Sequence, residues 1–234
     1  IDAAEKILRE IKPKGIIFLG GSVANFQNGF SSISVPAVLA TLVSDELHFP
    51  NLSMVGVDDR AAAHTAVAHL IAQGHSKIAV LGGPATSFPS RMRRLGAQDA
   101  MEQAGLTFDD RLYGLSNYDF ESAYHAMNSL LARRAEFTAL FAMSDVIAFG
   151  AIRALVSAGF RVPQDVSVIG FDGITMSRYC VPVMTTIVQP SEQIALQSIE
   201  LLINQIEHGA PAQTITLQPE LQQGESVCPC RHPL

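Results

Sequence analysis

The stretch DVSVIGFDG, residues 165–173, decides the fold class of this chain. Its apolar run between two aspartates is typical of a strand buried on both faces of a parallel sheet. Similar runs occur at GIIFL (15–19), LSMVGV (52–57), KIAVLGG (77–83) and ALFAM (139–143), and they alternate with amphipathic stretches. This alternation indicates βαβ units, so we predict an α/β fold with parallel sheets.

Shorter signals complete the expected order of elements. The stretches VPAVLATL, RLYGLS, TTIVQP and TITLQPEL each predict one further strand, and SEQIALQSIELLINQIEHG predicts a long amphipathic helix. Gly74 and Gly159 follow two predicted helices, as glycine does at left-handed helix ends. The polar stretch GGSVANFQNGFSSIS, residues 20–34, predicts a long loop.

Composition limits the partners of the chain. Its 234 residues carry a formal net charge of −6, without the excess of Lys and Arg that neutralises nucleic-acid phosphates. No stretch reaches the ~20 consecutive apolar residues of a membrane helix, and the first residues, IDAAEKILRE, do not resemble a signal peptide. We therefore expect no membrane association and no direct binding of DNA by this segment.

The three cysteines, Cys180, Cys228 and Cys230, do not indicate a disulfide framework. Their number is odd, and the single residue between Cys228 and Cys230 would strain a disulfide ring. No spacing of His and Cys resembles a zinc site. We expect free thiols, a reducing compartment, and neither a metal nor a cofactor.

Polar side chains follow several predicted strands. In open α/β sheets ligands bind outside the carboxyl ends of the strands, so these residues are the strongest binding candidates. Together they offer cations, carboxylates, hydroxyls, an aromatic ring and an amide, which suits a polyhydroxylated ligand such as a sugar. The candidates are Arg91, Arg93, Tyr118, Asp119, Ser144, Asp145, Asp172 and Gln189.

The same residues have structural explanations. The run RMRR (91–94) fits a solvated helix face, Asp145 and Ser191 fit helix caps, and Asp172 fits a turn. Motifs of catalysis are missing: GGSVA is not G-x-S-x-G, LGGPATS lacks the lysine of a phosphate loop, and no G-x-G-x-x-G opens a helix. We therefore expect a binding protein and no enzyme.

Longer stretches closely resemble the effector-binding core of lactose-repressor-type (LacI/GalR) transcription regulators, over most of residues 53–205. The similar stretches are VGVDDRAAAHTAVAHLIAQGHSKIAVLGGP, SRMRRLGAQDAMEQAGL, FTALFAMSDVIAFGAIRALVSAGFRVPQDVSVIGFDG and PVMTTIVQPSEQIALQSIELL. The resemblance implies a periplasmic-binding-protein-like fold of type I. In this fold two Rossmann-like lobes are joined by three crossovers, with an effector in the cleft between them.

The resemblance also implies domain boundaries. Residues 1–58 with 188–214 would form the N-terminal lobe, and residues 59–187 with 215–234 the C-terminal lobe. Family members carry a helix-turn-helix head, a hinge helix and a strand–helix–strand unit before the segment that resembles IDAAEKILREI. We therefore expect the natural protein to be longer, and the first-lobe sheet to lack that unit and its central strand.

Four residues match family positions that serve the effector. Arg93, the second arginine of R-x-R, matches the arginine that usually faces the ligand, and Arg91 would support it. Asp172 of G-F-D matches the cleft carboxylate. Gln189 of T-T-I-V-Q-P lies at a crossover that often contacts ligand, and Tyr118 falls where many members place an aromatic platform.

Two further positions depart from the pattern. Sugar-binding members commonly carry Asn where this chain has Ser144, which shortens one hydrogen-bonding arm. Thr41, after VPAVLA, stands where the first lobe supplies a polar contact, although a longer loop follows it. We expect both residues to contact the effector.

The resemblance favours a cytoplasmic regulator core that senses a small sugar or related polyol, forms a homodimer and reaches operator DNA only through the head. The alternative is an exported solute-binding protein that delivers a sugar to a transporter. An upstream secretion signal would favour transport, and a basic helix-turn-helix head would favour regulation. A sugar hydrolase would need a second carboxylate opposite Asp172, for which the sequence offers only weak candidates.

Overall fold

The computed structural model describes residues 1–134 and 136–231. The chain forms two compact units. Unit 1 contains Ile1–Asp58 and Pro190–Gln218, and unit 2 contains Asp59–Gln189 and Pro219–Leu234. The chain passes between the units three times, and the second and third passages follow Gln189 and Gln218. We expected them after residues 187 and 214. They come later because the strand before each passage first completes the sheet to which it belongs.

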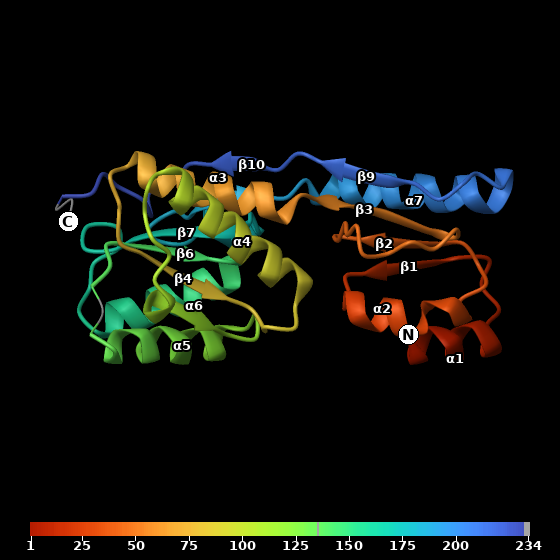
Figure 1. Cartoon of the computed structure of the whole chain (residues 1–234), viewed down its shortest axis with the longest axis horizontal. Helices are drawn as coiled ribbons and strands as arrows, with labels where there is room; N and C mark the ends of the chain where they lie inside the picture. Colours follow the sequence, from red (N-terminus) through yellow and green to blue (C-terminus); the bar gives the residue numbers. More distant parts are fainter. Residues whose placement is uncertain (135, 232–234) are drawn as a thin grey trace. The chain divides into compact units, whose positions relative to one another are not determined.

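Unit 1 is built on four parallel strands in the order β1-β2-β3-β9 (Figure 1). They are β1 (Ile16–Leu19), β2 (Ala37–Ala40), β3 (Leu52–Val57) and β9 (Thr214–Leu217). The four strands pair without a gap, and β1 forms one edge of the sheet. The strand–helix–strand unit expected before this segment stays a prediction. Helix α7 (Ser191–His208) covers one face, where Ile194 and Leu201 pack on Val38 and Val55.

The stretch expected to be a long loop, residues 20–34, is partly helical. It contains α2 (Val23–Gly29) and a short 3₁₀ helix, η1 (Phe30–Ser32). Val23, Phe26 and Phe30 follow one another at helical spacing and are buried, and the Phe26 and Phe30 rings stack 5.6 Å apart. The Asn, Gln and Gly residues between them made this apolar face hard to recognise in the sequence. Helix α1 (Asp2–Glu10) completes unit 1.

Unit 2 is built on six strands in the order β10-β8-β7-β6-β4-β5. Five run parallel, and β10 pairs with β8 in the antiparallel sense. The strands are β4 (Ile78–Gly82), β5 (Tyr113–Leu115), β6 (Ala139–Ala142), β7 (Ser167–Asp172), β8 (Thr185–Val188) and β10 (Glu220–Gln222). The stretch 165–173 thus supplies a central strand, as its apolar run predicted.

Helices cover both faces of this sheet (Figure 1). Helices α3 (Asp59–Ala72) and α4 (Phe88–Gln103) lie on one side, and α5 (Phe120–Ala132) and α6 (Asp145–Ser157) lie on the other. The short 3₁₀ helices η2 (Asp110–Leu112) and η3 (Thr175–Arg178) lie in the connections. The core between the layers is apolar and fully buried at Leu140, Phe141 and Ile169. The predicted α/β class with parallel sheets is therefore confirmed.

The prediction that TITLQPEL forms one strand is wrong. The stretch divides into β9 in unit 1 and β10 in unit 2, with Pro219 at the point where the chain crosses. Proline lacks the N–H that a continuous strand would donate, which favours a break there.

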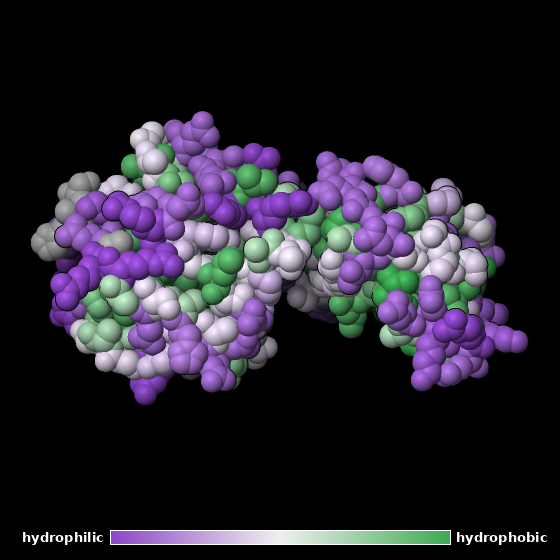
Figure 2. Space-filling model, turned by 60° about the horizontal axis from the view of Figure 1, so that its bottom comes forward, coloured by the Kyte–Doolittle hydropathy of each residue, from purple (hydrophilic) through white to green (hydrophobic). Residues whose placement is uncertain are grey.

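The visible surface of both units is mainly hydrophilic, with smaller hydrophobic patches (Figure 2). Within residues 1–134 and 136–231, no helix has the length and apolar character needed to cross a membrane.

Helices α3 and α4 approach closely at Gly96. A Cβ atom added there would lie 2.0 Å from the carbonyl oxygen of Arg60, far inside van der Waals contact. We expect Gly96→Ala to lower the free energy of unfolding by about 1–3 kcal/mol, because the helices must separate. Helix propensity alone would act in the opposite direction by up to ~1 kcal/mol.

Urea unfolding measures this change, with Glu102→Ala on the exposed face of the same helix as the control. The control should stay within ~0.5 kcal/mol of the wild type. An alanine at position 96 that leaves stability unchanged or higher would contradict the close packing.

Candidate functional site

A buried arginine organises the carboxyl edge of the unit 2 sheet. Arg93 lies on α4 and is only 6% exposed. Its Nε donates to Oδ1 of Asp59 at 2.7 Å, and its Nη1 donates to the carbonyl oxygen of Met143 and lies 3.7 Å from Oδ1 of Asp172. Its guanidinium carbon lies 3.6 Å from the centroid of the Phe171 ring. One cation thus joins α3, α4 and the ends of β6 and β7.

Asp172 ends β7 in a strained backbone conformation. Its φ of 107° is rare for a residue with a side chain and costs on the order of 1–3 kcal/mol. Gln189 donates from Nε2 to Oδ1 of Asp172 at 2.7 Å and from its backbone N–H to the Asp172 carbonyl at 3.0 Å. Burial raises the pKa of Asp172, while Arg93 and Gln189 oppose that shift. Because the side chain is still 29% exposed, the carboxylate is within reach of solvent.

Tyr118 lies at the same edge, after β5. Its φ of 60° also lies in the left-handed region. Its ring packs on Gly83, where any Cβ atom would lie 2.0 Å from a ring carbon. The Ser90 hydroxyl accepts a hydrogen bond from the Gly83 N–H at 2.7 Å and lies 3.1 Å from the Tyr118 hydroxyl. The aromatic ring is therefore fixed in place by its backbone and by its polar end.

Ser144 is the N-cap of α6. Its Oγ accepts from the Ile147 N–H at 3.1 Å, and the residue is buried. The cap expected at Asp145 is therefore wrong, since Asp145 is the first residue inside the helix. Similarly, Pro190 occupies the N-cap position of α7 that we expected for Ser191.

Asp145 has a different role, because it is completely buried and joins three elements. Its Oδ1 accepts from the Thr186 hydroxyl of β8 at 2.6 Å, and its Oδ2 accepts from the Ile174 N–H after β7 at 2.9 Å. Burial raises its pKa to about 6, although both hydrogen bonds favour the charged form. The residue fixes the turn that follows Asp172.

The remaining candidates lie apart from this group. Arg91 is exposed, and its guanidinium carbon lies 5.1 Å from the centroid of the Phe88 ring. Arg94, which belongs to the run interpreted as a helix face, is partly exposed and pairs with Asp110 at 2.7 Å. Asp119 caps α5 by accepting from the Ser122 N–H. Thr41 belongs to unit 1 and follows β2, and its contact with an effector stays a prediction.

The structure adds residues that sequence reasoning missed. Asp59 holds Arg93, Ser90 anchors Tyr118, and Thr186 holds Asp145. The doublet of acids after β3 was a signal for Asp59, since it follows a predicted strand. Nothing in the local sequence indicated the pairings of Ser90 and Thr186.

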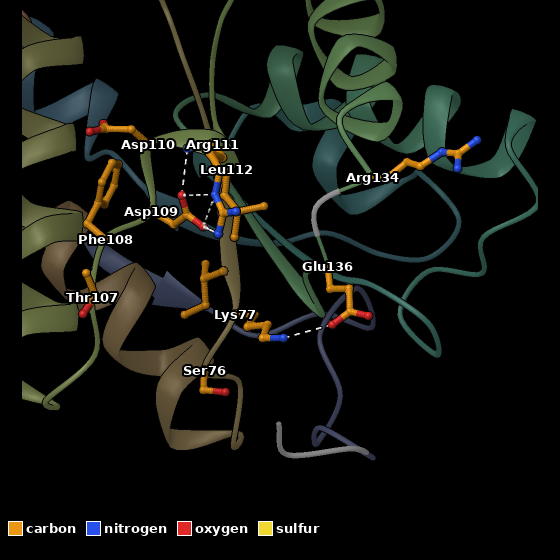
Figure 3. A pocket seen from close by; sticks show the side chains of 11 residues that line it. Ser76, Lys77, Thr107, Phe108, Asp109, Asp110, Arg111, Leu112, Arg134 and Glu136 are labelled. Carbon is orange, nitrogen blue, oxygen red and sulfur yellow. Dashed lines mark hydrogen bonds and ion pairs between the residues drawn. The ribbon is translucent and has the colours of Figure 1, made fainter.

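A pocket of about 720 Å³ lies at the opposite, amino edge of the unit 2 sheet (Figure 3). Two of its cations are paired with carboxylates of the pocket: Lys77 with Glu136 at 3.0 Å and Arg111 with Asp109 at 2.8 Å. It contains none of the predicted effector residues. Across the described residues, no group of three or more His, Cys, Asp and Glu side chains could hold a metal ion.

The parallel sheets and the polar carboxyl edge define a binding protein of the periplasmic-binding-protein type. Residues 67–227 match the family of periplasmic binding protein-like domains. The HTH-type transcriptional regulator MalR of Clostridium butyricum is 34% identical over 221 residues, a match that covers 94% of this chain and 66% of that protein.

Solved structures agree. The transcriptional regulator CelR in complex with cellobiose has a TM-score of 0.87 at 27% identity, covering 96% of this chain and 69% of that one. A sugar-binding LacI-family regulator from Escherichia coli, complexed with phosphate, has a TM-score of 0.82 at 29% identity, covering 98% and 82%. This chain belongs to the periplasmic binding protein-like family, as an effector-binding domain of LacI-family transcription regulators.

The expected resemblance is thus confirmed. The chain spans 66% of the length of the MalR relative.

The raised pKa of Asp145 predicts a pH-dependent stability. Between the ordinary carboxyl pKa of about 4 and the folded value of about 6, the folded protein keeps a proton that the unfolded chain has lost. The contribution of Asp145 to stability is therefore greatest below about pH 4 and falls by up to about 3 kcal/mol as the pH rises through 6.

Asp145→Asn removes this titration. We expect the wild-type free energy of unfolding, minus that of the variant, to fall between pH 4 and 6 and then to level off. Urea unfolding over this range measures it. A difference that is constant with pH would show that Asp145 does not titrate in this window.

Proposed function

We propose that the chain is the effector-sensing and dimerisation core of a cytoplasmic transcription regulator, which binds a small sugar or related polyol and performs no chemistry. The observation that carries this proposal is the group of Arg93, Asp172 and Gln189 at one strand edge. There, a buried cation orients a carboxylate that is still partly exposed.

The group suits a polyhydroxylated ligand. Sugar hydroxyls both donate and accept, so the Asp172 carboxylate can accept from a hydroxyl while an amide such as that of Gln189 serves as donor or acceptor. Tyr118 supplies an aromatic surface for the apolar face of a sugar ring. Arg93 favours the charged form of Asp172, and Thr41 would add a contact from unit 1. Ser144 would contribute through its polar edge position, although its Oγ already caps α6.

The relatives support a regulatory role more than a transport role. MalR, CelR and the Escherichia coli protein are all named as transcription regulators, and CelR was solved with cellobiose. A solute-binding protein that feeds a transporter would share the fold, but none of these three relatives is named as one. None of them is named as a sugar hydrolase either.

Control of DNA would be indirect. The net charge of −6 gives this segment no electrostatic attraction to phosphates. Effector binding would favour one geometry of a homodimer and so change how attached DNA-reading heads reach operator half-sites.

A thermal-shift screen against monosaccharides, disaccharides, sugar phosphates and nucleosides identifies the effector, because a ligand that binds only the folded form raises the melting temperature. For a sugar found in this way, we expect Asp172→Asn to weaken binding by about 1.5–3 kcal/mol, the scale of a hydrogen bond to a charged group. Isothermal calorimetry measures the change.

Asp165→Asn, at the amino edge, is the matched control and should bind like the wild type. Equal affinity in wild type and Asp172→Asn would remove Asp172 from the site. A screen in which no sugar or polyol shifts the melting temperature would reject the proposed ligand class.

The homodimer has a candidate surface at η3. Met176, Tyr179 and Val181 are exposed there, the last two by 78% and 95%, which is unusual for large apolar side chains in succession. We expect the chain to sediment as a dimer, and Val181→Asp to shift it toward the monomer.

The control is Leu115→Asp, which changes an exposed leucine on the edge strand β5 and should leave the dimer intact. Sedimentation velocity at several concentrations distinguishes these outcomes. A wild-type monomer at every concentration would refute the proposal.

A further inference from the structure

The two cysteines of the C-P-C sequence line one pocket together with His75, at the amino edge of the unit 2 sheet. Cys228 and Cys230 belong to the segment after β10, His75 follows α3, and Thr138 immediately precedes β6. These four residues line a pocket of about 230 Å³. Both thiols are free and only partly buried, whereas His75 is 3% exposed. The effector site described above uses none of these groups.

The hydrogen bonds of His75 have a fixed direction. Its Nε2 lies 3.0 Å from the carbonyl oxygen of Cys228, which can only accept, so Nε2 carries the proton. In the neutral ring Nδ1 is then an acceptor, and the Thr138 hydroxyl, 2.9 Å away, donates to it. Burial lowers the pKa of His75, which favours this neutral form.

The chain of donors continues to one of the two thiols. Because the Thr138 hydroxyl gives its hydrogen to His75, its oxygen is free to accept, and the Cys230 thiol donates to it at 3.8 Å. The Cys228 thiol instead donates to the Pro163 carbonyl at 3.3 Å. Cys230 therefore has a path, through Thr138, along which its proton can reach the unprotonated Nδ1 of His75. The Ser167 hydroxyl lies 3.9 Å from the Cys228 thiol and 3.1 Å from Nε2, but that nitrogen already carries a proton and cannot accept another.

We propose that Cys228 and Cys230 form a reversible redox site, in which Cys230 reacts first with a small peroxide and Cys228 then closes a disulfide. The proton of Cys230 passes through Thr138 to His75, and the thiolate attacks a peroxide oxygen. The O–O bond breaks, and Cys230 becomes a sulfenic acid as the first water leaves with the returned proton. The Cys228 sulfur then displaces the hydroxyl as a second water, so two thiols lose two electrons and hydrogen peroxide is reduced.

The spacing makes this disulfide easy to reduce again. A ring closed across a single residue is strained, and strained disulfides have more oxidising potentials than structural ones. Closing it would also disturb the segment, because Cys230 donates its backbone N–H to Gln73 at 2.8 Å and Cys228 binds His75 through its carbonyl. The reduced form is accordingly the resting state in a reducing compartment.

The test uses the full chain with Cys180→Ser, which removes the third thiol. Stoichiometric hydrogen peroxide should produce a monomer whose mass falls by two hydrogen atoms and whose tryptic peptides place the bond between positions 228 and 230. Dithiothreitol should restore the original mass. In the same background, Cys228→Ser should leave a sulfenic acid on Cys230 that dimedone captures.

Thr138→Val tests the relay, because valine keeps the shape and removes the hydroxyl. We expect oxidation of Cys230 to slow by about a hundredfold, the lower end of what positioned acid–base groups contribute. Ser129→Ala, on the exposed surface of α5, is the control, and circular dichroism checks that both variants are folded. A bond only between molecules, no loss of hydrogen, or a Thr138→Val rate equal to that of the wild type would each overturn the proposal.

Discussion

The carboxyl edge of unit 2 depends on the buried guanidinium of Arg93. A cation removed from water is costly unless it is fully compensated, and here two carboxylates, one carbonyl and one aromatic ring provide that compensation. Arg93 also acts on Asp172, because the cation favours the charged form of this carboxyl and so opposes the rise in pKa that burial causes. The edge is thus a network in which each charged group requires the others.

Much of unit 2 follows from the sequence, because strands buried on both faces are written as continuous apolar runs. That is why residues 165–173 predict β7 directly. The elements of unit 1 are harder to predict from the sequence. The helix α2 places three apolar residues among polar ones, and β9 and β10 look like one strand until the chain is seen to change sheets at Pro219.

The candidate site divides in a similar way. Strand ends pointed to Arg93, Asp172 and Gln189, and the structure brings these three together. Sequence position could not show that the Ser144 hydroxyl caps helix α6, or that Asp145 is buried against Thr186. The contact of Asp145 joins residues 41 positions apart, which local spacing does not encode, whereas the Ser144 cap is local and was expected one residue later.

The bond between Gln189 and Asp172 has a mechanical consequence. Gln189 is the last residue of unit 2 before the chain enters unit 1 through Pro190 and α7. A guest hydroxyl that competes for the same carboxylate oxygen would weaken one of the two hydrogen bonds that hold Gln189 to Asp172. Occupancy at the sheet edge would therefore loosen the segment of unit 2 from which the chain leaves toward Pro190.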